Sequence, residues 1–490
     1  MIHSNNFNCF YDLPEASLKF AFMNTKFTLI FMWFSYFASA QNEANNWYYG
    51  EHAGITFNTI PPVALPGGQI YTNEGCSSIS DAAGNLLFYS DGVKVWNRNH
   101  VIMPNGTGLH GNFSSSQSCL IANYPGSPGM YFIFTAPDYA ANYGLQYSII
   151  DMALDGGFGD VTAVKNVVLL PNSTEKLTAC AHRNGIDFWV VGHEFESANF
   201  YAWQVSSSGV SNTPVISASG TPHESDSTNV YSEQNRLGTM KISPCGDKIA
   251  CCVLTDSFLE LFDFNDSTGI VSNPLLLGTW PGLFPYGIYG VEFSSGCTKL
   301  YASNENPPIV VQYDLLAGSP GAIVASADTV CTSTFDYYGT LQNGPDGLMY
   351  LARLGNNDLG CITQPDMPGM ACAYVQNYAS APNTSSAVFG LPNYITTWFR
   401  NSATGIQHNV SGEEFALFPN PVSTVLQVNM NSTIEGKVRV QITNTLGTVL
   451  YTGQKNESRF LIPFNNYPQG IYFIKVEYGN KFMIRKILKL

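Results

Sequence analysis

A turn glycine followed directly by an apolar strand recurs along the middle of the chain. The opening glycines of the six clearest copies lie 45, 56, 61, 50 and 51 residues apart: Gly84, Gly129, Gly185, Gly246, Gly296 and Gly347. A repeat of this length is typical of one four-stranded blade of a β-propeller. Because a lone blade leaves both faces of its sheet uncovered, the repeats have to pack against one another in a closed ring.

Residues 46–399 have room for about seven such units. The sequence therefore predicts an all-β fold whose main part, residues 41–399, is a seven-bladed β-propeller. The 44 Gly and 27 Pro residues are spread along the chain and exclude long helices beyond the N-terminal region. We expect the opening segment 47–52 to pair with the stretch near 391–395 and to close the ring. Two stacked β-sandwiches are the alternative fold, but they would not produce this repeat.

The pattern changes after a polar linker at residues 400–412. In the segment 437–443, the apolar residues Val438, Val440 and Ile442 alternate with polar ones, which indicates a strand with one buried and one exposed face. Short alternating strands of this kind predict a small antiparallel β-sandwich at residues 413–490.

Residues 23–40 have the features of a signal peptide. A lone Lys26 precedes an apolar run, and small residues lead to an expected cleavage site between Ala40 and Gln41. A membrane anchor is the alternative, but the apolar run is shorter than the ~20 residues that a bilayer core requires. We therefore expect export and no transmembrane helix in the mature chain. Residues 1–22 precede a better start at Met23 and are expected to be an over-called translation start.

Ten of the eleven cysteines follow the leader, and an even number in an exported chain favours some disulfides. Cys361 and Cys372 could join the two sides of a hairpin. The alternative, that most cysteines are small buried apolar residues, stays open. Cys251 and Cys252 are adjacent in an expected strand and should point to opposite faces, so a bond between them is not expected.

Charge differs sharply between the two parts of the chain. The segment 41–412 carries 11 basic and 29 acidic residues, whereas the segment 413–490 carries nine Lys or Arg against five Glu. An acidic body repels the phosphate backbone of nucleic acids, so nucleic acid is excluded as a partner.

Four motifs near the C-terminus resemble the sorting domain of cargo proteins of the bacterial type IX secretion system. They are Phe418–Val422, Asn444–Gly453, Pro468–Tyr472 and Lys481–Lys489. An ordinary accessory β-domain is the alternative. The resemblance implies export to the periplasm, recognition of residues 413–490 by the outer-membrane machinery, and release or attachment at the cell surface. The residues that would carry the signal are Pro419, Asn420, Pro421, Gly447, Gly470, Lys486 and Lys489.

The segment 46–399 resembles an uncharacterised family of propellers that is common among such secreted proteins. The matching stretches are Glu74–Gly75, Phe88–Gly92, Trp96–His100, Met103–Gly106, Ser114–Ser118, Gly144–Met152, Glu175–Leu177, Lys241–Pro244 and Tyr289–Ser294. This resemblance implies the fold but supplies no activity.

Seven polar residues beside apolar strands are candidates for a binding face. They are Glu74, Asp91, Asp151, Glu175, Lys176, Lys241 and Glu292. In a propeller such groups either line the axial face, where ligands bind, or satisfy backbone groups between blades. Exposed aromatic residues at 139–143 and 280–289 could stack on sugar rings.

The most enzyme-like pair is His193–Glu194, with His182 as a third candidate catalytic residue. A multi-histidine metal site would require convergence of distant loops, and we expect no cofactor or metal. We therefore expect a non-catalytic module that binds glycan or protein at the cell surface. A polysaccharide lyase or glycosidase and a purely structural surface component are the alternatives.

Overall fold

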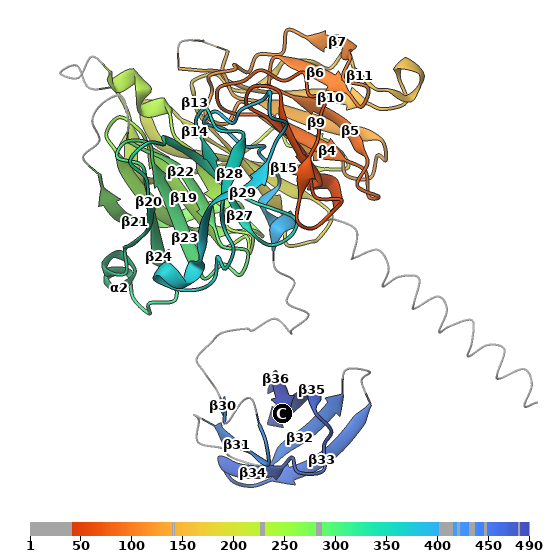
Figure 1. Ribbon diagram of the computed structural model, residues 1–490, viewed down its shortest axis with the longest axis vertical. Coiled ribbons are helices and arrows are strands. Elements are labelled where there is room, and N and C mark those ends of the chain that lie inside the picture. The colour runs from red at the N-terminus through yellow and green to blue at the C-terminus, as the bar shows by residue number, and fades with distance from the viewer. Residues whose placement is uncertain are drawn as a thin grey trace, which may run out of the picture. The chain divides into compact units, whose positions relative to one another are not determined.

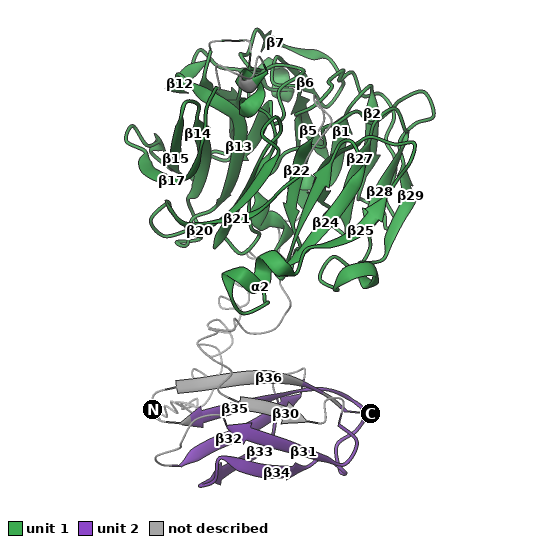
Figure 2. Cartoon of the chain, turned by 90° about the vertical axis from the view of Figure 1, so that its left-hand side faces the viewer, with its two compact units in different colours: residues 1–401 green, residues 402–490 purple. Residues whose placement is uncertain are grey.

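The computed structural model describes residues 42–139, 141, 143–225, 231–280, 287–400, 415–418, 422–430, 437–444, 448–478 and 481–489. The chain divides into two compact units, Met1–Asn401 and Ser402–Leu490 (Figure 2). The expected signal peptide with Ala40 and Gln41, and the sorting-signal residues Pro419, Asn420, Pro421 and Gly447, lie outside the described residues.

Seven antiparallel sheets follow one another along the described part of the first unit (Figure 1). The first three sheets are β1–β3, β4–β7 and β8–β12. Their strands are β1 (Asn46–Tyr49), β2 (Ala53–Thr56), β3 (Val63–Ala64), β4 (Ser77–Ser80), β5 (Leu86–Ser90), β6 (Lys94–Asn97), β7 (Ile102–Thr107), β8 (Cys119–Asn123), β9 (Met130–Thr135), β10 (Leu145–Asp151), β11 (Asp160–Val161) and β12 (Val167–Leu170).

The next four sheets are β13–β17, β18–β21, β22–β25 and β26–β29. Their strands are β13 (Ser173–Ala181), β14 (Phe188–Glu194), β15 (Ser197–Ser206), β16 (Gly209–Val210), β17 (Val215–His223), β18 (Met240–Ile242), β19 (Lys248–Val253), β20 (Phe258–Asn265), β21 (Ile270–Thr279), β22 (Ile288–Phe293), β23 (Lys299–Asn304), β24 (Ile309–Asp314), β25 (Asp328–Thr332), β26 (Tyr338–Asn343), β27 (Met349–Arg353), β28 (Asp358–Ile362) and β29 (Tyr374–Ser380). The short helices are η2 (Asn42–Ala44), η3 (Asp155–Gly157), η4 (Ser232–Arg236), α2 (Pro320–Ala325), η5 (Gly369–Cys372) and η6 (Thr396–Phe399).

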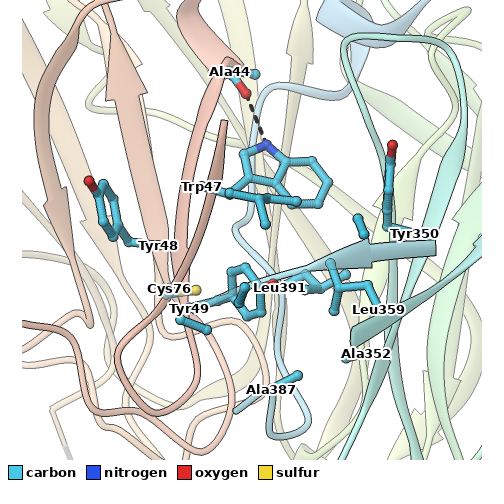
Figure 3. Close-up of a cluster of buried hydrophobic side chains, with 14 of the residues drawn as sticks. Ala44, Trp47, Tyr48, Tyr49, Cys76, Tyr350, Ala352, Leu359, Ala387 and Leu391 are labelled. Carbon is cyan, nitrogen blue, oxygen red and sulfur yellow. Dashed lines mark hydrogen bonds between the residues drawn. The ribbon is translucent and has the colours of Figure 1, made fainter. Parts of the chain in front are cut away.

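The first strands of these sheets form a ring. Each contacts the first strand of the following sheet, in the order β1, β4, β8, β13, β18, β22 and β26. The ring closes where Trp47 of β1 packs against Tyr350 of β27, with ring centroids 5.5 Å apart (Figure 3). This arrangement confirms the all-β propeller. The count of seven blades stays a prediction, because one of the sheets has three strands instead of four.

Apolar side chains fill the space between neighbouring sheets, and strands such as β19 therefore have both faces covered. Cys251 and Cys252 of β19 illustrate this, since Cys251 packs with Val191 of the preceding sheet and Cys252 packs with Val291 of the following sheet. Their side chains therefore point to opposite faces of the strand, as the alternation of strand residues requires.

Residues 386–400, here called the axial segment, occupy the centre of the ring. The segment bonds to the first strands of several sheets: Ser77 of β4 donates its hydroxyl to the carbonyl of Asn393, and Asn393 donates its side-chain amide to the carbonyl of Leu177 in β13. The expected pairing of 47–52 with 391–395 differs from what is found. Glu51 bridges to Ser386, whereas Pro392 bridges to Cys76, directly before β4, and Ile395 bridges to Ala179 of β13.

The cysteines meet both expectations in part, because one disulfide forms and most of the others are buried. Cys245 and Cys297 form a disulfide between loops of two adjacent sheets, and the other eight described cysteines are free and buried. The expected Cys361–Cys372 bond is wrong. Cys361 belongs to the apolar cluster around Trp47, whereas Cys372 packs with Tyr301 in a different cluster.

The second unit is a sandwich of two antiparallel sheets, ordered β30-β31-β34 and β33-β32-β35-β36. The strands are β30 (Phe415–Phe418), β31 (Val425–Met430), β32 (Val438–Asn444), β33 (Val449–Lys455), β34 (Arg459–Pro463), β35 (Gly470–Tyr478) and β36 (Lys481–Lys489). Val438, Val440 and Ile442 are fully buried, while Arg439 between them is exposed. The predicted small antiparallel β-sandwich is confirmed.

The described residues contain no helix that is both long and apolar enough to span a bilayer.

Candidate functional site

The ring has two ends, which the strand directions define. We call the end where the first strand of each sheet begins the entry end, and the end where it finishes the exit end. The structure brings three of the seven predicted binding residues together at the entry end: Glu74 before β4, and Glu175 and Lys176 in β13. Lys241 and Glu292 lie at the axis, and Asp91 and Asp151 lie in separate turns.

Glu74 and Glu175 are buried carboxyl groups held by the serine-rich segment before β8. Glu175 Oε2 accepts hydrogen bonds from the backbone N–H of Ser116 at 2.7 Å and from its hydroxyl at 2.8 Å. Ser114 donates its hydroxyl to Glu74 Oε1 at 3.4 Å. On the other side, the Tyr289 hydroxyl donates to Glu74 Oε2 at 2.8 Å. The two carboxyl groups therefore share one polar environment.

Burial makes these carboxyl groups weaker acids than they are in water. Burial raises the pKa of Glu175 to about 7, and burial together with the nearby charge of Glu175 raises the pKa of Glu74 well above its usual range. Burial also raises the pKa of Glu305, a neighbour of Glu74, to about 8. The cluster can hold protons at neutral pH, and it can therefore donate or accept a proton.

The two cations beside this cluster, Lys176 and Arg236, donate hydrogen bonds to backbone carbonyls. Lys176 donates its ammonium to the carbonyls of Arg236 and Leu237 at 3.0 and 2.8 Å, and its burial lowers its pKa. Arg236 lies over the ring of Phe195 at 3.7 Å and donates to the carbonyl of Ser173. These contacts fix the loop before β18 against β13.

Lys241 and Glu292 form a buried ion pair inside the ring, with Nζ and Oε2 3.7 Å apart. Lys241 also donates to Gln342 Oε1 at 2.7 Å and to Asn393 Oδ1 at 3.2 Å. Burial raises the pKa of Glu292 to about 7 and lowers that of Lys241. This network connects β18, β22 and β26 to the axial segment.

Asp91 and Asp151 each stabilise a turn. Asp91 Oδ1 accepts hydrogen bonds from the backbone N–H groups of Val93 and Lys94 at 2.8 and 2.7 Å. Asp151 Oδ1 accepts one from Ala153 at 2.8 Å. Side-chain oxygens of this kind commonly satisfy turn backbone.

The three residues named as candidate catalytic groups do not meet. His182 donates its backbone N–H to the carbonyl of Asp187 at the exit end of the β13–β14 hairpin. His193 lies near the other end of β14. Because a strand rises about 3.3 Å per residue, the two histidines are roughly 20 Å apart along the hairpin. Glu194 accepts hydrogen bonds from Ser197 and Asn199. His193 is fully buried and stacked on His223 at 3.9 Å, and burial lowers its pKa to about 3.

Within the described ranges, no three His, Cys, Asp or Glu side chains lie close enough together to hold a metal ion.

A cavity of about 800 Å³ lies at the exit end, and the sequence had not indicated it. Loops from three successive sheets and the end of the axial segment line it. Its aromatic lining residues are Tyr124, Tyr131, Phe188 and Trp398, and its polar ones include Glu43, Asp81, Asn123 and Asp187. The loop between Tyr124 and Tyr131, rich in Gly, Pro and Ser, was the available sequence signal.

The aromatic segments predicted to stack on sugars lie elsewhere. Tyr289 is buried, and Tyr143 is half exposed but stacked on His110, with ring centroids 4.1 Å apart.

Solved structures similar to this chain are distant. A periplasmic gluconolactonase from Pseudomonas aeruginosa is 12% identical, with 90% of this chain and 98% of that chain covered and a TM-score of 0.36. A quinoprotein alcohol dehydrogenase-like protein from Bacteroides thetaiotaomicron is 11% identical, with coverages of 68% and 76% and a TM-score of 0.38. Likenesses at this level do not indicate the activity of this chain. No curated protein matches the sequence.

The second unit has a clear relationship. Of the residues named for the sorting signal, Gly470 is the first residue of β35, and Lys486 and Lys489 lie in β36. The two strands pair, with Gly470 opposite Lys489 and Phe473 opposite Lys486. Residues 416–489 match the family described as the secretion system C-terminal sorting domain. This part of the chain is therefore a type IX sorting domain, which directs the protein to the cell surface or the extracellular space.

Proposed function

We propose that the propeller is a glycan-binding module carried to the cell surface by its sorting domain, and that the glycan lies in the exit-end cavity. The observation that carries this proposal is the lining of the cavity, which combines the partly exposed rings of Tyr124, Tyr131 and Trp398 with carboxylate and amide groups. Its volume is in the range of about 300–1,000 Å³ that is usual for ligand pockets.

Both kinds of lining group suit a sugar. A pyranose ring has an apolar face that covers an aromatic ring, and Tyr and Trp supply large contact areas with a polar edge. The hydroxyl groups around the same sugar donate to carboxylates such as Asp187 and exchange hydrogen bonds with amides such as Asn123. The two kinds of group come from two of the segments that line the cavity, residues 123–131 and residues 181–188.

Retention of the purified full chain on insoluble cellulose, chitin and chitosan tests this proposal. We expect saturable retention on at least one of them, and a more than tenfold weaker affinity for Trp398→Ala and for Tyr131→Ala. The matched control is Tyr143→Ala, because this tyrosine is half exposed and does not line the cavity. No retention on any support, or equal loss in the control, would contradict the proposal. Unchanged melting temperatures separate lost binding from lost folding.

A polysaccharide-degrading enzyme is the second candidate, and the paired carboxyls Glu74 and Glu175 favour it. Two buried acids that share an environment are suited to acid–base chemistry when burial raises the pKa of both, that of Glu175 to about 7. New reducing ends or unsaturated products from the same polysaccharides, abolished by Glu175→Gln, would establish this activity. Stable retention without products would leave the binding module as the function.

A further inference from the structure

The exit-end cavity is negatively charged on several sides. Its lining includes Glu43 of η2, Asp81 after β4 and Asp187 before β14. None of its lining residues, all within the described part of the chain, is Lys, Arg or His. Arg183, in the neighbouring loop, lies 3.9 Å from Asp266 of another sheet. The carboxylates of the cavity therefore have no lining cation to balance them.

The three carboxyl groups differ in how they are held. Asp81 accepts hydrogen bonds from the backbone of Ala83 and Asn85, and although partial burial acts in the opposite direction, these bonds lower its pKa. It is a fixed negative charge. Asp187 Oδ2 is held by Asn184 and Gln204, both at 2.8 Å. Glu43 Oε2, by contrast, is buried without a hydrogen-bond partner.

Neighbouring groups respond to this charge. Burial, and then the charges of Glu43 and Asp81, raise the pKa of Tyr131 to about 12. Burial raises the pKa of Glu43, and the charge of Asp81 raises it further. Glu43, Asp81 and Tyr131 therefore form one electrostatic group on one side of the cavity. A cation bound there would face carboxylates and the electron-rich faces of aromatic rings.

We propose that the cavity selects an amino sugar, a glucosamine-type unit whose protonated amine lies among Glu43, Asp81 and Asp187 while its ring lies against the aromatic residues. This inference rests on the proposed glycan-binding function and names its ligand class. A neutral sugar would bring no charge to offset the loss of water around Asp81 and Asp187, whereas an ammonium group pairs with carboxylates.

Three hexasaccharides that differ only at the C2 substituent provide the test: β-1,4-linked glucosamine, N-acetylglucosamine and glucose. Titration calorimetry of the full chain, in slightly acidic buffer that keeps the amine protonated, should give the glucosamine hexamer an affinity about tenfold higher than the other two. Added salt should reduce this difference, because it screens charge. In alkaline buffer, where the amine is neutral, the difference should disappear.

The double variant Glu43→Gln/Asp187→Asn removes charge while preserving side-chain shape. We expect it to reduce the preference for glucosamine to less than about twofold and to leave binding of the acetylated hexamer unchanged. The control is Asp155→Asn, an exposed acid outside the cavity whose backbone already adopts a positive φ that Asn tolerates. Its preference should equal that of the unmodified chain.

The outcomes separate this inference from the function on which it rests. If none of the hexamers binds, the glycan-binding proposal itself is wrong. If the neutral hexamers bind as tightly as the glucosamine hexamer, the module binds glycan but the amino-sugar assignment is wrong. The assignment is also wrong if hexalysine binds as tightly as the glucosamine hexamer, because the cavity would then recognise charge without the sugar ring.

Discussion

The centre of the propeller and the centre of the sorting domain are built in opposite ways. At the propeller axis, Lys241 contacts a glutamate, a glutamine and an asparagine, which joins three sheets and the axial segment. In the sandwich, Val440, Ile474 and Ile487 are fully buried in an apolar cluster. The centre of the ring is therefore held by a few hydrogen bonds and one ion pair. The centre of the sandwich is held by many apolar contacts, each of which contributes a small part of the stability.

The largest expected effect comes from breaking the buried ion pair. Lys241→Met leaves Glu292 without its cation inside the ring, where it has to stay charged or take up a proton, and breaking a buried pair in this way costs about 3–5 kcal/mol. Urea unfolding of the full chain should show this loss in the propeller transition.

The double variant Lys241→Met/Glu292→Leu sharpens the test, because it removes both charges. We expect it to recover much of the lost stability. If the single variant is as stable as the unmodified chain, the polar axis does not stabilise the ring and the contrast with the sandwich fails.

The corresponding change in the sandwich is Ile474→Ala. It deletes a fully buried side chain and should lower the stability of the sorting domain by about 2–5 kcal/mol. Because the chain forms two compact units, calorimetry should show a lower melting temperature for the sandwich and an unchanged one for the propeller. A shift in both transitions would show that the units do not unfold independently.

The smallest expected effect is a pH dependence at the entry end of the ring. Glu305 has a folded-state pKa of about 8, raised by burial, against about 4.3 in an unfolded chain. The folded protein therefore holds this proton more tightly, so the stability from Glu305 is complete below the unfolded value and is lost as the pH rises towards 8.

Glu305→Gln cannot ionise and should remove about 2 kcal/mol of this pH-dependent loss, with allowance for partial solvation of the site. Melting temperatures of both proteins across this pH range provide the measurement. Equal slopes would mean that Glu305 ionises in the folded ring without penalty.

The features of the fold that depend on residues close together in the sequence could be predicted from the sequence. The repeat of turn glycines indicated the propeller, and the alternation around Val440 indicated the sandwich. The separation of His182 from His193 could also have been foreseen, because a strand between them places them at opposite ends of a hairpin. The axial segment could not, since the contact between Ser77 and Asn393 joins residues 316 positions apart. The exit-end cavity was missed because its walls are loops from separate sheets that meet only when the ring closes.

The axial segment also sets the order in which this protein can be completed. Residues 386–400 follow every sheet of the propeller in the chain, so they are the last part of the ring to be made. The contact between Trp47 and Tyr350 can form without them, but the carbonyl of Leu177 and the ammonium of Lys241 cannot reach their partner Asn393. A chain that ends before position 386 would therefore form a ring with unpaired polar groups at its centre, and we expect such a ring to be less stable.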